Sequence, residues 1–310
     1  MADNTANPLV KQLPENHLGH DYIVGDIHGC YDELMALMEF VRFDKKHDRI
    51  FCTGDLIHRG PKPLDCLDLL GEKWFYTTLG NHDDYFNQKQ FEKEEDYIDL
   101  YDYKEKLTCL PYIYHVKHRH LNDFYIIHAE FNYEQLFYPQ KVDVKPEEKL
   151  SLILNNDYTK EIKKIIGSGF RMDETSRKKM IWERTIYKGF IDKNKDKILK
   201  GDFSFLNEQK VKRGEIIMFC GHTVVPFPMH VGQQIYMDTG ACYGYLDYKR
   251  LKYYSMWGSR FFSLSMMDVN NGTVYSCVTN EKTIPDENGD YFRRGDILTM
   301  GQSVYPSILK

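Results

Sequence analysis

The chain has 310 residues, a formal net charge of −5, 42% hydrophobic residues and 28% charged residues, a balance that excludes a disordered or fibrous protein. The length fits one large α/β domain. The negative charge and the lack of a long Lys/Arg block argue against nucleic acid as the main partner, and no apolar run approaches the roughly 20 residues that span a bilayer.

The cysteine pattern and the first residues favour a cytoplasmic location. Seven cysteines are scattered along the chain without a C-x-x-C pair, which is typical of reduced thiols. The starting residues Met-Ala-Asp-Asn-Thr have neither the basic start nor the apolar stretch of a secretory signal. We therefore expect a cytoplasmic protein, with export into a host cell by a signal-less route left open.

Over the first quarter of the chain, predicted strands and helices alternate. Apolar runs predict three short strands, at residues 22–24, 50–53 and 74–79, each followed by Gly-Asp or Gly-Asn. Between them, apolar residues recur at helical spacing over residues 34–41, and Pro63 opens a second helix. Such repetition is typical of a parallel sheet with right-handed crossovers, whose ligand-binding loops gather at the carboxyl ends of the strands.

The rest of the chain carries more widely spaced signals. Apolar runs predict strands at residues 124–127, 215–220, 234–237, 261–267 and 274–278. Residues 84–110 have a helical pattern, and a Lys- and Glu-rich segment at about 145–205 is expected to form a helical insertion that caps the site. Residues 1–18 are polar and without period, which predicts a flexible arm. Since no linker divides the remainder, we expect a single domain over residues 19–310.

Metal-capable side chains follow the predicted strands at their ends. They are Asp26, His28, Asp55, Asn81, His82, His128 and His222. All offer nitrogen or oxygen and none is a cysteine, which suits Mn²⁺, Fe or Zn²⁺ better than Ca²⁺ or a thiolate site. Neighbouring glycines let the backbone turn sharply off each strand. Any one of these residues alone would be interpreted as a turn or core residue, but the ordered set predicts a metal site.

Five segments resemble a known family. Gly25-Asp26-Ile27-His28-Gly29, Gly54-Asp55-Leu56-Ile57-His58-Arg59-Gly60, Gly80-Asn81-His82-Asp83, the strand end at His128 and Gly221-His222 resemble the phosphoprotein phosphatase family of metallophosphoesterases. The first three resemble its bacterial and bacteriophage branch, which includes the lambda-type protein phosphatase and, nearby, the diadenosine tetraphosphate hydrolases. The resemblance runs from about residue 21 to 245. It implies an α/β fold, an αββα sandwich with two mixed β-sheets and a helical insertion.

The resemblance also implies two divalent metal ions, with Mn²⁺ expected and Fe or Zn²⁺ as alternatives. Asp26, His28 and Asp55 would hold the first ion. Asp55 would bridge to the second, which Asn81, His128 and His222 would complete. Two cations about 3.5–4 Å apart need a shared anionic ligand to offset their repulsion, and a carboxylate can supply it.

Further residues are implied in catalysis. Arg59 and, by a looser match, Arg184 would bind phosphate oxygens, and His82 would protonate the leaving group. His58 stands where the family usually has an aspartate that pairs with the catalytic histidine. The pKa of His82 should then be held up less firmly, unless Asp83 or another carboxylate takes that role.

Three further segments are assigned as follows. Glu130 replaces a glycine of the family and is expected to add bulk and charge beside the second metal. The Asp238-Thr239-Gly240 turn is interpreted as architecture, and His115, His118 and His120 as solvated side chains.

The leading hypothesis is metal-dependent hydrolysis of phosphate monoesters on proteins by a water that two metal ions activate, with serine, threonine and tyrosine all open as carriers. An alternative is hydrolysis of dinucleoside polyphosphates such as diadenosine tetraphosphate, in which Tyr-rich residues 97–114 could stack a base. A second alternative is a catalytically impaired binding module, for which only His58 argues. The expected partner is a phosphorylated protein, with no nucleic acid and no membrane span, and the oligomeric state stays open.

Overall fold

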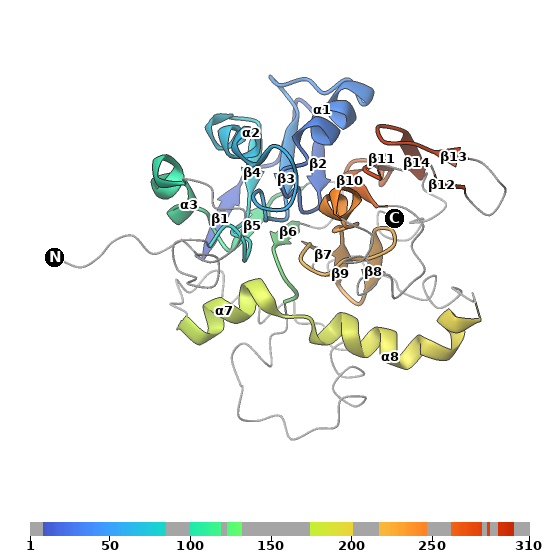
Figure 1. Cartoon of the computed structure of the whole chain (residues 1–310). Helices are drawn as coiled ribbons and strands as arrows, with labels where there is room; N and C mark the ends of the chain where they lie inside the picture. The colour runs from blue at the N-terminus through green and yellow to red at the C-terminus, as the bar shows by residue number, and fades with distance from the viewer. Residues whose placement is uncertain are drawn as a thin grey trace.

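The computed structural model describes residues 9–84, 100–118, 123–131, 174–200, 217–246, 262–280, 284–285 and 291–300 (Figure 1). Two six-stranded mixed sheets dominate this part of the chain. Sheet 1 has the order β1 (Val10–Leu13), β5 (Ile113–Val116), β6 (Phe124–Ile127), β7 (Ile217–Cys220), β9 (Gln234–Tyr236) and β8 (Met229–Val231). Sheet 2 has the order β14 (Ile297–Met300), β11 (Val274–Val278), β10 (Ser263–Asp268), β2 (Asp21–Val24), β3 (Arg49–Cys52) and β4 (Phe75–Thr77). A short pair, β12 (Ile284–Pro285) and β13 (Tyr291–Phe292), completes the strands described.

The two sheets pack face to face. Their shared core contains Ile23 and Phe51 from sheet 2 and Phe124 and Phe219 from sheet 1. The ring of Phe51 meets that of Phe124 edge-on at 5.9 Å between centroids, and Phe124 meets Phe219 in the same way at 5.9 Å. The first pair joins the two sheets and the second joins neighbouring strands of sheet 1, so edge-to-face contacts fill this core.

The described helices lie around the two sheets (Figure 1). They are α1 (Tyr31–Phe40), α2 (Pro63–Asp68), η1 (Leu69–Gly71), η4 (Tyr101–Tyr103), α3 (Lys104–Thr108), α7 (Glu174–Trp182), α8 (Thr185–Leu199) and η6 (Ala241–Tyr245). α1 packs on β10 and β11 of sheet 2, and the Tyr187 ring of α8 packs on Tyr236 of sheet 1, with centroids 5.4 Å apart. Figure 1 shows α1 and α2 on one side of the strands and α7 and α8 on the other, which is the expected αββα arrangement.

Most predicted strands are confirmed. β2, β3 and β4 are parallel neighbours, as the strand–helix repetition predicts, and β6 and β11 begin and end at the predicted residues. The prediction of an arm without structure is wrong for Val10–Leu13, which forms β1. This strand is half exposed and is held by parallel pairing with the edge of β5, a partner about a hundred residues away that local sequence does not reveal.

The predicted helical insertion agrees with α7 and α8, while its residues 145–173 and 201–205 lie outside the described residues. Of the segment 84–110, residues 85–99 lie outside them too, and the remainder forms η4 and α3. Within the described ranges, no helix combines the length and apolarity needed to cross a bilayer.

Candidate active site

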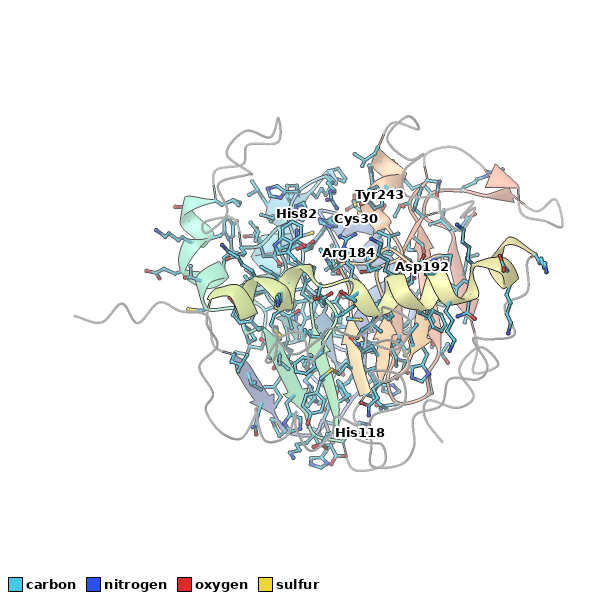
Figure 2. All side chains as sticks on the ribbon, turned by 90° about the horizontal axis from the view of Figure 1, so that it is seen from below. Cys30, His82, His118, Arg184, Asp192 and Tyr243 are labelled. Atoms are coloured by element: carbon cyan, nitrogen blue, oxygen red, sulfur yellow. The ribbon has the colours of Figure 1, made fainter. Side chains whose placement is uncertain are left out.

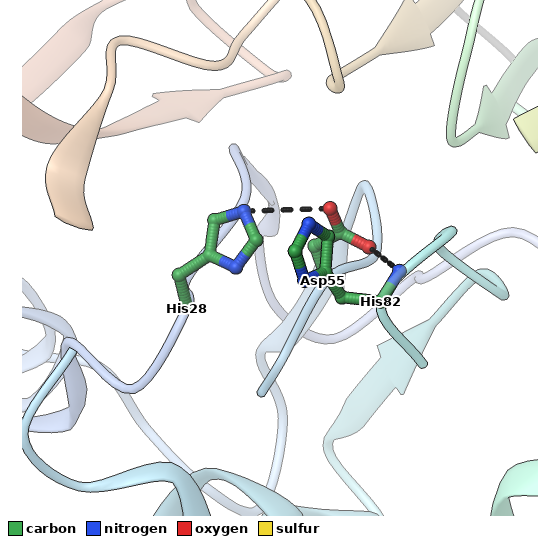
Figure 3. A group of neighbouring side chains, drawn as sticks. All are labelled: His28, Asp55 and His82. Carbon is green, nitrogen blue, oxygen red and sulfur yellow. Dashed lines mark hydrogen bonds and ion pairs between the residues drawn. The ribbon is translucent and has the colours of Figure 1, made fainter. Parts of the chain in front are cut away.

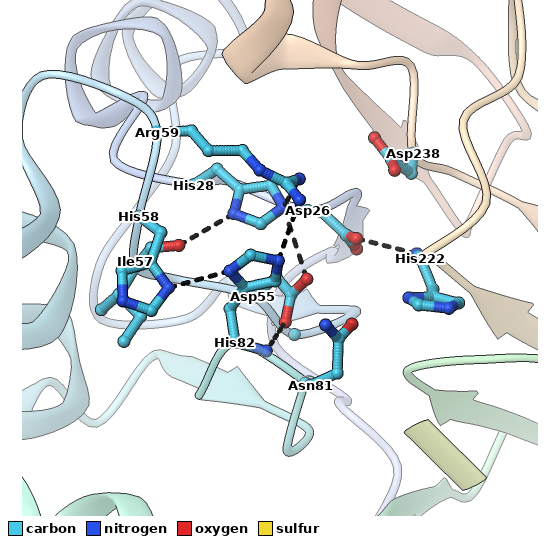
Figure 4. Close-up of polar contacts among 12 residues, drawn as sticks. Asp26, His28, Asp55, Ile57, His58, Arg59, Asn81, His82, His222 and Asp238 are labelled. Carbon is cyan, nitrogen blue, oxygen red and sulfur yellow. Dashed lines mark hydrogen bonds and ion pairs between the residues drawn. The ribbon is translucent and has the colours of Figure 1, made fainter. Parts of the chain in front are cut away.

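The motif loops leave both sheets at one end and meet in a single pocket. The pocket has a volume of about 220 Å³ and is lined by His28, Asp55, Arg59, Asn81, His82, Trp182, Arg184, His222, Asp238 and Tyr243. Figure 4 shows the polar contacts around it. The structure therefore brings together residues from motifs that are up to two hundred positions apart.

Asp55 lies at the centre of the site. Its Oδ2 is 3.3 Å from His28 Nε2, and its Oδ1 is 3.6 Å from His128 Nε2. Two groups with metal-ligand spacing share this carboxylate, one formed with His28 and His82 (Figure 3) and one with His128 and His222. A single carboxylate with one oxygen toward each group is the arrangement that a bridging ligand requires.

The histidines are held with their Nε2 atoms toward the pocket. His28 Nδ1 lies 2.8 Å from the Ile57 carbonyl and His128 Nδ1 lies 2.9 Å from the Thr53 carbonyl. Because a carbonyl only accepts, each Nδ1 carries the hydrogen, which fixes the tautomer as in metal-binding histidines. Burial lowers the pKa of His28 well below its usual range and the pKa of His128 to about 3, so both rings are neutral.

His128 gives a further indication of a cation. Its Nε2 lies 2.9 Å from Oδ1 of Asn81. With the hydrogen on Nδ1, both facing atoms are acceptors, and two lone pairs that point at each other are stabilised by a positive charge between them.

Buried acids add to this demand for positive charge. Burial raises the pKa of Asp26, and the neighbouring Asp238 and Asp55 carboxylates raise it further. Burial also raises the pKa of Asp238 to about 6. Asp26 accepts hydrogen bonds from Thr53 Oγ1 and from the backbone of His222, both at 2.7 Å, and lies outside the two groups that share Asp55. The donor set as a whole fits two divalent cations.

Arg59 and His58 contact His82 from opposite sides (Figure 4). The Arg59 guanidinium lies 3.0 Å from His82 Nε2 and 3.2 Å from His28 Nε2, and it stacks over the Tyr243 ring at 5.6 Å. His58 Nδ1 is 2.8 Å from His82 Nδ1. The residue that replaces the family aspartate therefore meets the predicted acid directly.

Arg184 lies in the pocket, as its looser match predicts. It stands between α7 and α8, and its Nε donates to His222 Nε2 at 2.9 Å. The ring of Trp182 meets the His222 ring edge-on at 5.6 Å. In Figure 2 the labelled side chains of Arg184, His82 and Tyr243, which line the same pocket, lie in the upper half of the view, and His118 lies at the bottom.

Asp83, an open alternative as the partner of His82, and Glu130, expected to add charge beside the second metal, both bind backbone N–H groups instead. Asp83 does not serve His82: its oxygens accept the backbone N–H groups of Asp55 (2.7 Å), Leu56 (2.8 Å) and Gly80 (3.1 Å) and so hold the Asp55 loop. The carboxyl group of Glu130 does not face the second ligand group, which consists of Asp55, His128 and His222. Its carboxylate accepts N–H groups from the start of α8, and burial raises its pKa to about 8 while these bonds oppose the rise.

Other residues also differ from the prediction. His115 is buried, not solvated: its Nε2 lies 2.9 Å from Asp123 and its ring stacks on Tyr125 at 4.5 Å, while His120 lies outside the described residues. Asp238 lines the pocket in addition to shaping a turn. Its signal, an acid that follows an apolar strand, is similar to the one that identifies Asp26 and Asp55, although Asp238 lacks the preceding glycine; Trp182 and Tyr243 carry no such local signal.

The motif loops are strained. Six described non-glycine residues have positive φ, and all but Arg42 belong to the motifs: His28 (45°), Asp55 (52°), His58 (71°), Arg59 (71°) and His222 (62°). Left-handed backbone at non-glycine residues costs free energy and clusters at functional sites. Gly80 shows how tight the packing is, because a Cβ there would lie 2.1 Å from Asp55 Oδ1.

Comparison with known proteins agrees with this geometry. A family profile described as calcineurin-like phosphoesterase matches residues 22–258. The chain is 32% identical over 158 residues to a symmetrical bis(5'-nucleosyl)-tetraphosphatase of Psychromonas ingrahamii, covering 47% of this chain and 56% of that relative. It is 41% identical over 75 residues to serine/threonine-protein phosphatase 1 of Salmonella typhimurium, covering 24% of this chain and 35% of that relative. Against serine/threonine-protein phosphatase 2 of the same species the identity is 26% over 243 residues, covering 75% of this chain and 93% of the relative.

The chain therefore spans about half the length, or less, of the first two relatives. The family profile, by contrast, covers most of this chain. Its members use a binuclear metal centre, which is what the shared carboxylate and the two histidine groups fit. The protein is thus a member of the calcineurin-like phosphoesterase family, with phosphoprotein phosphatases among its relatives.

Proposed function

We propose that the protein hydrolyses phosphate monoesters on proteins. The observation that carries this proposal is the pocket itself, in which Asp55 is shared by two ligand groups and two arginines and His82 line the same space. At about 220 Å³ it is smaller than the roughly 300–1,000 Å³ of sites that enclose a whole small molecule. A pocket of this size suits a substrate that inserts one phosphate group and stays outside with the rest, as a phosphorylated side chain does.

In this proposal Asp26, His28 and Asp55 would hold one divalent cation, and Asp55, Asn81, His128 and His222 would hold the second, with Mn²⁺ expected and Fe or Zn²⁺ as alternatives. When bound, the pair supplies Lewis-acid polarisation of the phosphate and activation of water. Asp55 and the buried acids balance the charge of the cations. The neutral histidines offer their Nε2 lone pairs, which the carbonyls of Ile57 and Thr53 keep in place.

The remaining polar residues act on the substrate. Arg59 and Arg184 bind the non-bridging phosphate oxygens from two sides of the pocket. His82 gives a proton to the leaving oxygen, and His58 and Arg59 fix the direction of its ring. The walls of Trp182 and Tyr243 limit the entry of water around the phosphate.

A specific observation favours a second candidate, hydrolysis of dinucleoside polyphosphates. Trp182 is 41% exposed at the edge of the pocket, and an exposed indole can stack a nucleobase. The Psychromonas relative carries that activity in its name. The alignment that covers 93% of a relative is, however, the one to a serine/threonine-protein phosphatase, which supports the first proposal.

All seven cysteines are free thiols, which supports a reducing, cytoplasmic location and a phosphorylated cytoplasmic protein as partner.

A comparison of substrates tests the proposal. With Mn²⁺ supplied, kcat/KM is measured for peptides that carry phosphoserine, phosphothreonine or phosphotyrosine and for diadenosine tetraphosphate, with His82→Ala as the matched inactive control. We expect turnover of at least one phosphopeptide to exceed that of the dinucleotide. Preferred cleavage of diadenosine tetraphosphate would favour the second candidate. Phosphopeptide binding without any turnover would identify an impaired binding module.

A further inference from the structure

Four consecutive backbone N–H groups at the start of α8 are bound by only two carboxylates. Glu183 Oε1 accepts from Arg184 at 3.1 Å and from Thr185 at 2.9 Å. Glu130 Oε2 accepts from Ile186 at 2.6 Å and its Oε1 from Tyr187 at 2.7 Å. The first N–H groups of a helix have no partner within the helix, and here they are fully satisfied.

Glu130 differs from Glu183 because it comes from another part of the fold. It lies two residues after His128, at the end of β6, and it is completely buried. Its Oε1 also accepts the hydroxyl of Tyr236 on β9 at 2.9 Å. Its own backbone N–H donates to the Glu183 carbonyl at 3.4 Å. One side chain thus joins a strand of sheet 1, a second strand and the first turn of α8.

The helix start that Glu130 binds carries Arg184. This arginine directly precedes α8, and its side chain reaches the pocket, where it donates to His222. The backbone of this junction meets the end of β6 through two long hydrogen bonds, from the Ala129 N–H to the Met180 carbonyl at 3.3 Å and from the Glu130 N–H to the Glu183 carbonyl at 3.4 Å, and neither involves Arg184. The two Glu130 oxygens accept successive N–H groups of one helix start, so the contact is directional.

We infer that Glu130 is a positioning residue for phosphate binding: it fixes the first turn of α8 to the end of β6 and so sets the place of Arg184 relative to the metal ligands. This inference rests on the proposed function, because it assigns Arg184 to phosphate. Burying a carboxyl group is costly. Three hydrogen bonds offset that cost. Two come from backbone N–H groups of α8, the helix that directly follows Arg184, and one comes from the Tyr236 hydroxyl on β9.

The inference predicts a loss that passes through Arg184. In Glu130→Gln the shape is kept, but one of the two acceptor oxygens is replaced by an NH₂ group that cannot accept. Binding of inorganic phosphate to the metal-loaded protein, measured by calorimetry, should weaken about 10- to 100-fold, the scale of a small misplacement of a binding group. In an Arg184→Ala background the same change should have less than about a twofold effect, since the group that Glu130 positions is already gone. KM for a phosphopeptide should rise with the phosphate dissociation constant, and metal content should be unchanged.

Hydrogen exchange provides a readout that does not depend on activity. Amide exchange at Ile186 or Tyr187 should become about tenfold faster in Glu130→Gln and should stay unchanged in Arg184→Ala. Asp48→Asn is the matched control, because Asp48 is also buried and accepts two backbone N–H groups, from His20 and Asp44, at the far end of β3 from the pocket. It should leave phosphate affinity and the α8 amides as in the wild type.

Several results would overturn the inference. Unchanged phosphate affinity or unchanged α8 exchange in Glu130→Gln would show that Arg184 needs no such anchor, while the proposed function would stand if the wild type binds phosphate. Equal losses with and without Arg184, or a loss of metal, would place the role of Glu130 at His128 instead. If the wild type itself does not bind phosphate, the proposed function fails together with the inference. If Glu130→Gln does not fold, Glu130→Asp, which keeps the carboxyl group and shortens its reach, replaces it with the same expected order of effects.

Discussion

The contact between His58 and His82 permits a substitution whose effect can be worked out in advance. Their Nδ1 atoms lie 2.8 Å apart between buried rings. Burial lowers the pKa of His82 well below its usual range, and the charges of His28, Arg59 and His58 lower it further. Protonated His82 is the form that donates to the leaving group, so the rate falls as the pH rises through this pKa. A carboxylate at position 58 favours the protonated form, and His58→Asp should move the basic limb of the pH–rate profile to higher pH.

The size of this effect follows from the distance. A carboxylate about 4 Å from the imidazolium attracts it by about 4 kcal/mol at an effective dielectric constant of about 20. Because about 1.4 kcal/mol changes an acid dissociation constant tenfold, the upper limit is about 10³-fold. Aspartate is shorter than histidine and the pocket is open to water on one side, which both reduce the attraction. We therefore expect the limb to move by at least about one pH unit.

The assay compares kcat against pH for the wild type, His58→Asp and His58→Asn. Asparagine is the matched control, because it removes the imidazole without adding charge, and its limb should move much less. A phosphoserine peptide has a poor leaving group and should show the full effect. An activated aryl phosphate needs little protonation and should show a small one. With the phosphoserine peptide, the basic limb of the His58→Asp profile could stay at the wild-type pH while His82→Ala has a strongly reduced kcat. Residue 58 would then not control the pKa of His82, and the reasoning would be refuted.

Three further predictions concern the metal ligands, the arginine and the glycine contact. Activity should be lost on prolonged chelation and restored best by Mn²⁺, and full activity in excess chelator would contradict this. Asp55→Asn should lose at least one metal ion and nearly all turnover, which metal analysis by mass spectrometry and an activity assay check. Arg59→Ala should lower kcat/KM by about 10²-fold or more at unchanged metal content, and a near-normal rate would show that the guanidinium does not bind phosphate. Gly80→Ala should displace Asp55, since the new Cβ would lie 2.1 Å from Asp55 Oδ1. It should lower kcat by about 10²-fold and reduce the metal content. Gly71→Ala, with open space around it, should leave both unchanged.

The strands that position the site could be predicted because their signal is local. Asp21–Val24 and Phe124–Ile127 are buried along their whole length, and residues 22–24 and 124–127 form unbroken apolar runs before a polar turn. Val10–Leu13 is exposed at its two central residues, and only pairing with β5 makes it a strand. The strand motifs therefore follow from sequence, while an edge strand depends on a partner that is distant in the chain.

The candidate site divides in the same way. Asp26, His28, Asp55 and Asn81 sit in short motifs directly after strands, and the structure places them at one pocket or beside it. The partners of Asp83 and Glu130 could not be predicted, because each carboxylate binds backbone N–H groups that lie up to 57 positions away. No residue pattern marks a backbone donor, so such contacts become visible only in three dimensions.

The strain and the charge of the site point to the same physical requirement. The left-handed backbone of non-glycine residues, among them Asp55 and Arg59, costs free energy of folding. Contacts within the motif loops do not offset this cost. Burial raises the pKa of Asp26 and of Asp55, so that close carboxylates stay unfavourable without positive charge. The Asp83 bonds and the glycine at position 80 nevertheless hold Asp55 in one place. The site holds buried anions and neutral imidazoles around one carboxylate, an arrangement that lowers the stability of the metal-free fold. Such a site is organised to bind cations, and cation binding stabilises the folded protein.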